Sequence, residues 1–295
     1  MLQPYRDTMG GMLEKAKPTP SVWEAEYWNG AAAERWVKFQ QQFDRAFDPF
    51  ARALAECSAL RSGEQVLDVG CGCGTTTLAA SRQVAPGGSA TGVDLSNPML
   101  ARACARADGV PNVRFICGDA GTYAFDRRFD VCVSQFGVMF FVDPVTAFRH
   151  LRHALRPGGR VAFVCWRRMD ENPWVTIPLE AVLQAAQRAP EPPTVGAGPF
   201  AFGERARVEG VLADAGFAAV NVRSFDADVL LSTTGLADAV TFSAHAGPAG
   251  RLLGEVSPQV RLAGTLAIAD ALARHVDDGK VRLGGATWVV TARAP

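Results

Sequence analysis

The chain lacks an excess of charge of either sign, because 30 basic and 30 acidic side chains balance within its 295 residues. A nucleic-acid-binding surface normally appears as a clustered basic excess, so nothing here indicates a nucleic-acid partner. The longest apolar stretch, at about residues 131–142, is interrupted and far shorter than the roughly 20 residues that span a bilayer. No N-terminal segment has the apolar core of a signal peptide. We therefore expect a cytoplasmic protein that binds neither nucleic acid nor a membrane.

The sequence also lacks a metal-ligand pattern. Its seven cysteines are scattered, and Cys117, Cys132 and Cys165 fall inside expected strands, as small buried side chains do in a reducing compartment. Cys71 and Cys73 lie two positions apart, but no second pair with metal-binding spacing follows them. The sequence therefore predicts no metal site.

What is present is a glycine-rich motif at residues 66–75. A short apolar run carries Asp68 and is followed by Gly70, Gly72 and Gly74, after which a helix is expected to begin. Glycines let the backbone approach a ligand closely, and a helix start offers unpaired N–H groups to it. A dinucleotide fingerprint needs its third glycine one residue later, and Asp68 would repel a pyrophosphate. The pattern instead resembles motif I of the class I S-adenosylmethionine (SAM)-dependent methyltransferases.

Later segments continue this resemblance in order and at the expected spacing. Asp94 ends a second strand, 20 residues beyond Gly74, where a carboxylate can accept hydrogen bonds from ribose hydroxyls. Asp119 ends a third strand, residues 129–141 hold a fourth, and a Leu-Arg-Pro-Gly-Gly turn at 155–159 precedes a fifth. The resemblance covers about residues 60–166 and a C-terminal hairpin. It points to the small-molecule branch with ubiquinone-type and glycine N-methyltransferase-like enzymes.

A second resemblance lies near the N-terminus, where Tyr27 and Trp36 flank an Asn-Gly pair. This segment is similar to the opening of glycine N-methyltransferase-type enzymes, which folds over the cofactor. An aromatic ring beside a sulfonium gains a cation–π contact, so we expect both rings near the methionine end of SAM. The alternative is an amphipathic helix packed on the core, because aromatic residues recur at helical spacing from Trp36 to Phe50.

Together the resemblances imply a set of cofactor-binding residues, and aromatic residues beyond the fourth and fifth strands are candidates for an apolar wall that receives the methyl acceptor. The cofactor set is Tyr27, Trp36, Asp68, Gly70, Cys71, Gly72, Asp94, Leu95, Met99, Asp119, Ala120, Ser134 and Gln135. The acceptor wall is Phe136, Phe140, Trp166 and Trp174, for which packing in the core under a lid is an equal alternative. No strong signature of a catalytic base is present, and the candidate is His245.

The alternation of strands and helices over residues 65–166 predicts a doubly wound, mostly parallel sheet. The resemblance implies the seven-stranded, Rossmann-like α/β methyltransferase fold, with an antiparallel seventh strand between the fifth and sixth. Residues 1–60 are expected to form an arm and cofactor-covering helices, and residues 61–295 the methyltransferase domain. Insertions at about 167–202 and 227–280 are expected to form a helical substrate lid, which could also serve a homodimer.

The function implied is methyl transfer from SAM, by in-line displacement, to O, N or C of a small apolar or aromatic metabolite. Two alternatives remain open at this point. One is a protein that binds SAM or S-adenosylhomocysteine (SAH) without transferring a methyl group, in a regulatory or cyclase-like role. The other is an NAD-dependent oxidoreductase, which the glycine spacing disfavours.

Overall fold

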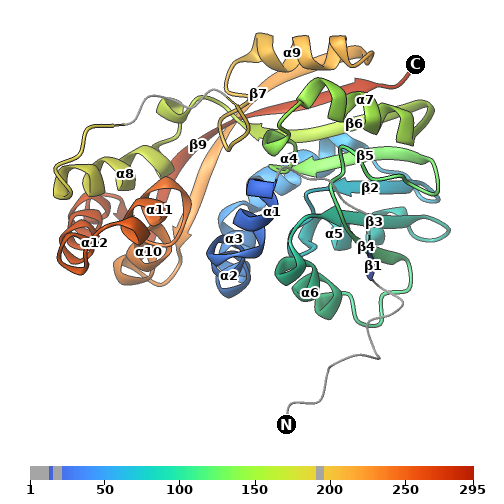
Figure 1. Cartoon of the computed structure of the whole chain (residues 1–295). Helices are drawn as coiled ribbons and strands as arrows, with labels where there is room; N and C mark the ends of the chain where they lie inside the picture. Colours follow the sequence, from blue (N-terminus) through green and yellow to red (C-terminus); the bar gives the residue numbers. More distant parts are fainter. Residues whose placement is uncertain (1–12, 16–21, 191–195) are drawn as a thin grey trace.

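The computed structural model describes residues 13–15, 22–190 and 196–295. One sheet runs through its centre in the order β1-β4-β3-β2-β5-β6-β9-β7, with β8 pairing to β9 (Figure 1). The strands are β1 (Leu13–Lys15), β2 (Gln65–Val69), β3 (Ser89–Asp94), β4 (Val113–Cys117), β5 (Phe129–Gln135), β6 (Leu155–Trp166), β7 (Ala218–Ser232), β8 (Val276–Asp277) and β9 (Lys280–Arg293).

The strand pairing confirms the expected α/β fold. The strands from β1 to β6 pair in parallel, whereas β9 is antiparallel to both β6 and β7 and lies between them. The seven long strands match the expected seven, and the described residues add two short ones, β1 and β8. The turn expected at 155–159 is the irregular start of β6, because Gly158 and Gly159 exchange backbone hydrogen bonds with Ala294.

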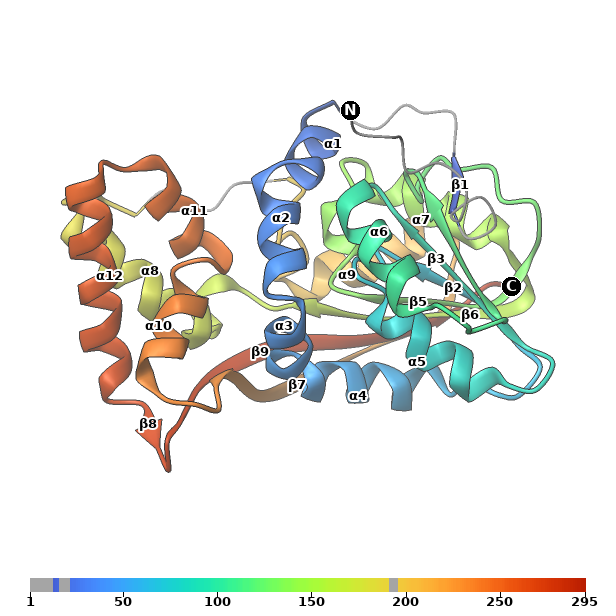
Figure 2. The same ribbon diagram turned by 90° about the horizontal axis from the view of Figure 1, so that it is seen from below.

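Helices cover both faces of the sheet, as doubly wound folds require. Figures 1 and 2 show α7 and α9 over one face and α4, α5 and α6 over the other. Their bounds are α4 (Asp48–Ser58), α5 (Thr75–Val84), α6 (Asn97–Arg106), α7 (Pro144–Ala154) and α9 (Arg205–Asp214). The central strands β2 and β5 are buried along almost their whole length, which explains their continuous apolar sequence.

Three N-terminal helices stand beside the sheet: α1 (Val22–Asn29), α2 (Ala31–Lys38) and α3 (Gln40–Ala46). Figure 2 shows them as a column between the sheet and the remaining helices. Much of the N-terminal arm expected before them lies outside the described residues.

The remaining helices form a separate layer at the far end of the β7–β9 ribbon (Figure 1). We call this layer the lid; it consists of α8 (Pro173–Ala185), α10 (Leu236–Ser243), α11 (Gly247–Glu255) and α12 (Pro258–Ala273). Two single-turn helices, η1 (Val138–Phe140) and η2 (Met169–Glu171), lie nearer the sheet. Residues 191–195 of the first expected insertion lie outside the described residues.

The second insertion was expected to be helical from residue 227, and this boundary is wrong. Strand β7 continues to Ser232, and its last residues pair with the first half of β9. The strand continues because its side chains pack with the period of a strand. Val229 and Leu231 lie two positions apart on the same face of β7, and both are buried. The lid therefore sits on a rigid two-stranded ribbon. None of the described helices is long and apolar enough to cross a membrane.

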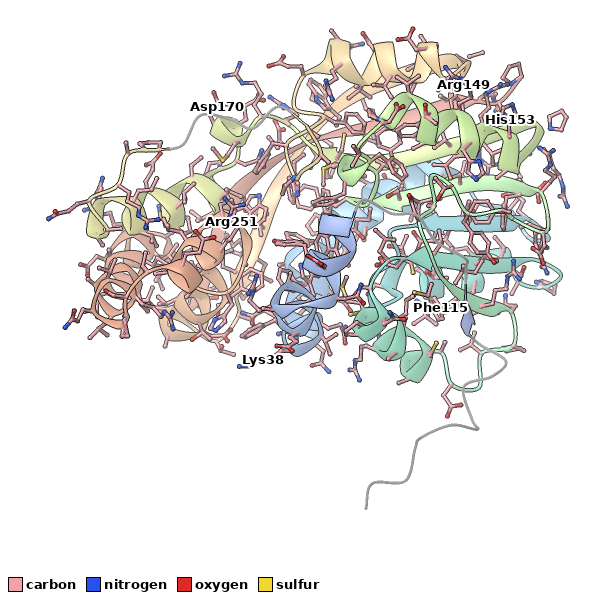
Figure 3. The ribbon with its side chains drawn as sticks, viewed as in Figure 1. Lys38, Phe115, Arg149, His153, Asp170 and Arg251 are labelled. Atoms are coloured by element: carbon pink, nitrogen blue, oxygen red, sulfur yellow. The ribbon has the colours of Figure 1, made fainter. Side chains whose placement is uncertain are left out.

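We predict that Gly92→Ala destabilises the fold, because β3 runs directly beneath α5 at this position. An added Cβ would lie 2.8 Å from Cys71 Sγ, Thr77 Oγ1 and Phe115 Cδ1. Phe115 is fully buried on β4, beneath α6 (Figure 3). Overpacking of this kind costs about 1–3 kcal/mol, measurable as a lower denaturant midpoint. The control Gly210→Ala has open space on α9 and should stabilise by about 0.5–1 kcal/mol. Equal midpoints for the two variants would contradict this account of the packing.

Candidate cofactor site

The glycine motif forms a tight loop between β2 and α5, at the carboxyl edge of the sheet. Gly70, Gly72 and Gly74 have φ values of 67°, 52° and 82°, in the left-handed region that favours glycine. A Cβ on Gly70 would lie 2.6 Å from the Cα of Gly137, so the loop touches the chain that leaves β5. A Cβ on Gly137 would lie 2.4 Å from the carbonyl oxygen of Val69. The floor of the site is therefore a backbone-to-backbone contact.

Ser134 locks this contact from within. Its fully buried hydroxyl donates to the Val69 carbonyl at 2.7 Å and accepts from the Gly137 N–H at 3.1 Å. The chain then turns through Phe136, whose φ of 64° is unusual for a bulky residue. Ser134 thus joins the ends of β2 and β5, and its contact with a cofactor stays a prediction.

Asp94 lies opposite the glycine loop at the end of β3. Its carboxylate accepts hydrogen bonds from the Gly72 N–H at 2.8 Å and the Ser96 N–H at 2.9 Å. Burial raises the pKa of Asp94 above its ordinary value, while the backbone N–H donors oppose that rise. Each carboxylate oxygen keeps a further lone pair for a ligand hydroxyl.

Asp68 lies on β2, behind the loop, and is 1% exposed. Its Oδ2 accepts from the Thr77 hydroxyl at 2.6 Å, but its buried Oδ1 has no hydrogen-bond partner among the described residues. Burial, with a smaller contribution from the Asp94 charge, raises the pKa of Asp68 to about 7. A buried carboxylate oxygen without a partner fits a site completed by a ligand that carries donors or positive charge.

The expected adenine-side residues lie on the strand next to Asp94. Asp119 follows β4, where its Oδ1 accepts from the Gly121 N–H at 2.8 Å. Neighbouring Ala120 is buried. Gly118 donates its N–H to the Asp94 carbonyl at 2.9 Å, which holds the two strand ends together. Asp94 and Asp119 therefore share one edge of the sheet, as the sequence predicts for parallel strands.

The thiols of the glycine loop are neutral and buried. Burial raises the pKa of Cys73 to about 12, and burial together with nearby carboxylates raises the pKa of Cys71 well above its ordinary value. Such cysteines behave as small apolar side chains. In the part of the chain that the structure describes, no group of three His, Cys, Asp or Glu residues is placed to hold a metal ion.

The N-terminal helices lie over the loop through side chains that sequence reasoning missed. Asn29 donates to the Leu95 carbonyl at 3.0 Å and accepts from the Asn97 N–H at 2.9 Å, which ties the end of α1 to the β3–α6 turn. Trp36 stacks on Phe43 with ring centroids 3.9 Å apart. In the sequence the Asn-Gly pair belongs only to the N-terminal resemblance, and no pattern in it indicates the contact with Leu95.

Trp36 also packs against a small apolar cluster made of Ala33, Cys73 and Met99. Trp36 of α2 and the predicted adenine-side Met99 of α6 therefore belong to one cluster with Cys73 of the glycine loop. Tyr27 is edge-on to Trp28, which in turn is edge-on to Phe140, each at 5.1 Å between centroids.

Asp44 of α3 also links the N-terminal helices to the glycine loop. It accepts from the Thr75 hydroxyl at 2.7 Å and pairs with Arg106 of α6 at 3.0 Å. Arg106 donates further to the Cys73 carbonyl at 2.7 Å. These partners lie 31 and 62 positions from Asp44 along the chain, so no local pattern could have identified them.

Gln135, at the end of β5, connects the same surfaces. Its amide donates to the Phe47 carbonyl at 3.2 Å and accepts from the Thr76 hydroxyl at 3.4 Å. The structure thus places Gln135, a member of the predicted cofactor set, between α5 and the α3–α4 junction, and its contact with a cofactor stays a prediction.

Three of the four predicted acceptor-wall residues lie together. Phe136 and Trp166 are stacked with centroids 4.2 Å apart, and Trp174 follows at 5.0 Å from Trp166. Phe47 contacts all three rings at 5.4–5.6 Å. Phe140 instead packs on Trp28 of α1.

The histidines do not converge on this wall. His245 has its Nδ1 2.7 Å from the Thr241 carbonyl of α10, and its ring lies 4.9 Å from that of Phe39. His150 contacts the Tyr123 carbonyl at 2.7 Å. His153 points away from the molecule on α7 (Figure 3). A catalytic role for His245 stays a prediction.

We predict that Asp44→Asn loosens the helical cover, because the neutral amide loses the ion pair with Arg106. Amide hydrogen exchange over residues 31–46 should become several-fold faster. The control is Asp48→Asn, which removes an exposed pair with Arg52 on α4 and should change this exchange little. Unchanged exchange in Asp44→Asn would show that apolar packing alone holds the cover.

We predict a pH dependence of stability from Asp68, whose folded-state pKa of about 7 lies above its ordinary 3.8. The folded state therefore holds this proton more tightly, and the associated stability is present below the unfolded pKa and lost as pH rises through about 7. Asp68→Asn cannot titrate. Its free energy of unfolding relative to wild type should rise by about 2–3 kcal/mol between about pH 5 and about pH 8. A constant difference, measured by denaturant unfolding, would contradict the assignment.

Comparisons with known proteins agree with this geometry. A model of the methyltransferase domain family matches residues 66–159. Aklanonic acid methyltransferase DauC from Streptomyces sp. strain C5 is 36% identical over 120 residues, which is 40% of this chain and 54% of that enzyme. Demethylmenaquinone methyltransferase from Staphylococcus aureus strain JH9 is 31% identical over 185 residues, which is 58% of this chain and 74% of that enzyme.

Solved structures share the fold at low identity. A methyltransferase from Bacillus halodurans C-125, described as putative, has a TM-score of 0.53 at 18% identity, covering 83% of this chain and 98% of its own. Phosphoethanolamine N-methyltransferase 2 from Haemonchus contortus, in complex with SAM, has a TM-score of 0.53 at 18% identity over 88% of this chain and 57% of its own. The cyclase SpnF also has a TM-score of 0.53, at 21% identity over 90% of this chain and 96% of its own.

The fold alone therefore does not identify the activity, because a cyclase shares it with methyltransferases. The family is assigned from the sequence relatives. The demethylmenaquinone methyltransferase is 31% identical and covered over 74% of its length, and the methyltransferase domain match at residues 66–159 includes the glycine loop. The chain belongs to the class I SAM-dependent methyltransferases, in the ubiquinone-type branch, and its cofactor is S-adenosylmethionine.

Proposed function

We propose that the protein transfers the methyl group of SAM to a small, apolar or aromatic acceptor. The observation that supports the proposal most directly is that the glycine loop and the aromatic wall are adjacent at Gly137. On one side lies the glycine loop with Asp94, and on the other lies the aromatic wall that begins at Phe136. The two relatives that support the substrate class are methyltransferases of aklanonic acid and of demethylmenaquinone.

The predicted cofactor residues divide by the part of SAM that each would hold. Gly70, Gly72 and the N–H groups at the start of α5 would hold the polar end, with Asp68 behind them. Asp94 would accept hydrogen bonds from the ribose hydroxyls. The adenine would lie against Leu95, Met99, Asp119 and Ala120. SAM supplies an electrophilic methyl group on a sulfonium, and the rings of Tyr27 and Trp36 are the predicted cation–π partners of its positive charge.

The chain contributes alignment and exclusion of water rather than acid–base chemistry. Displacement at the methyl carbon needs the acceptor atom in line and close, and an apolar aromatic wall would favour a flat acceptor held in that way. Phe47 from the N-terminal helices and Trp174 from the lid close the wall around Trp166. A base is needed only where the acceptor must lose a proton, and His245 remains the candidate for that step.

The partner implied by this function is the methyl acceptor itself. The homodimer and the cytoplasmic location expected from the sequence remain predictions.

The test of this function is methyl transfer by the full chain from SAM labelled in the methyl group. We expect label in a flat apolar acceptor, such as a hydroxynaphthoquinone or a phenolic polyketide, with stoichiometric formation of SAH. Label appearing only in basic peptides or RNA would contradict the small-molecule assignment.

Asp94→Asn should weaken SAH binding by about 10- to 100-fold, because an ionised acceptor of two ligand hydroxyls becomes a neutral amide. The amide oxygen can still accept from a loop N–H, so the fold should persist. The matched control is Asp143→Asn, at the N-cap of α7, where the carboxylate accepts from the Thr146 N–H. Calorimetric titration measures both. Equal SAH affinity for Asp94→Asn and wild type would remove Asp94 from the cofactor site.

A further inference from the structure

The lid encloses a small cavity next to the aromatic wall. Its volume is about 10 Å³, the size of one water-sized group, and it lies between α8, the end of β7 and the α10–α11 junction. Most of its lining is apolar: Val175, Pro178, Leu231, Phe242, Ala246 and Ala249. No ionisable side chain lines it among the residues described.

Two polar side chains interrupt this apolar lining. Trp174 is 8% exposed and Ser243 is 4% exposed, and both line the cavity. Within the described residues, the indole Nε1 of Trp174 and the hydroxyl of Ser243 are buried without a hydrogen-bond partner. Buried polar groups in folded proteins are normally satisfied, so both atoms call for a partner from outside the chain.

The chemistry of the two atoms defines that partner. An indole N–H can only donate, and a serine hydroxyl can donate or accept. An oxygen with two lone pairs can accept from both at once. Because no cationic side chain lines the cavity, a carboxylate or phosphate would be left without charge compensation, so the group is neutral. A water molecule meets these conditions in the free protein, and a carbonyl or phenolic oxygen of a ligand meets them in its place.

Trp174 connects the cavity to the proposed site of methyl transfer. Its ring contacts Trp166 at 5.0 Å and Phe47 at 5.4 Å, and Trp166 is stacked on Phe136 at the end of β5. The cavity therefore lies at the end of the wall that is farther from the glycine loop.

We propose that Trp174 and Ser243 form a two-donor subsite for a neutral carbonyl or phenolic oxygen, at the end of the methyl acceptor remote from the transferred methyl. This inference rests on the proposed function and adds a specificity determinant to it. A site built to hydrogen-bond such an oxygen rejects analogues that lack it, because its donors are then left unpaired.

The probes are tetralone and tetralin, which share one bicyclic skeleton and differ in the carbonyl oxygen. Each is titrated into the full chain, alone and with saturating SAH, with ¹⁵N-labelled tryptophan. The sequence has six tryptophans, and Trp174→Phe identifies the indole signal that belongs to Trp174. We expect tetralone to shift the Trp174 indole N–H signal downfield and tetralin to leave it nearly unmoved.

Ser243→Ala removes the hydroxyl with little change in volume. It should weaken tetralone binding by about tenfold and leave tetralin binding unchanged. The matched control is Thr241→Ala on the same helix, because its exposed hydroxyl is already bonded to the Ala237 carbonyl. That variant should bind both probes as wild type does.

The outcomes separate the two proposals. Absence of SAH binding to the wild type would overturn the proposed function, and the titration without SAH would still decide the subsite. Equal affinity for the two probes, no effect of Ser243→Ala, or binding of neither probe would overturn the subsite while SAH binding stayed intact.

Discussion

The contact between Gly70 and Gly137 is the constraint on which the rest of the site depends. Neither position has room for a Cβ, so the backbones leaving β2 and β5 touch directly. Ser134 holds them together from within through two hydrogen bonds. Because of this contact, the glycine loop and the aromatic wall share one floor. Under the proposed function, this floor would bring a cofactor in the loop into line with an acceptor at the wall.

Two carboxylates are buried close to this contact, where their ionised forms are destabilised. Asp68 and Asp94 are two carboxylates at the ends of neighbouring strands, and burial raises the pKa of both. Asp94 is compensated by backbone donors, whereas one oxygen of Asp68 has no partner among the described residues. Such strain is typical of a functional site, where a cationic ligand offsets it. The same reasoning underlies the subsite proposed in the lid, where the polar atoms of Trp174 and Ser243 have no partner among the described residues.

The fold was predictable where the signal is local. The glycine spacing, the acids at strand ends and the central strands of unbroken apolar sequence placed β2 to β6 correctly, and the resemblance placed β9 between β6 and β7. The extension of β7 to Ser232 was missed, because an alternating segment beside helical sequence reveals its partner strand only in three dimensions. The clamp of Asp44 on Thr75 and Arg106 was also missed, since its partners are distant in sequence. The cavity beside Trp174 forms where α8, the end of β7 and the α10–α11 junction pack together. No local sequence pattern indicates such a contact.

The most direct test of the account is parallel calorimetric titration of the purified chain with SAH and with NAD. The third glycine falls too early for a dinucleotide, and Asp68 sits where a pyrophosphate would be repelled. The account predicts stoichiometric, micromolar binding of SAH and no binding of NAD. Binding of NAD without binding of SAH would contradict the assignment of the glycine loop and of everything built on it.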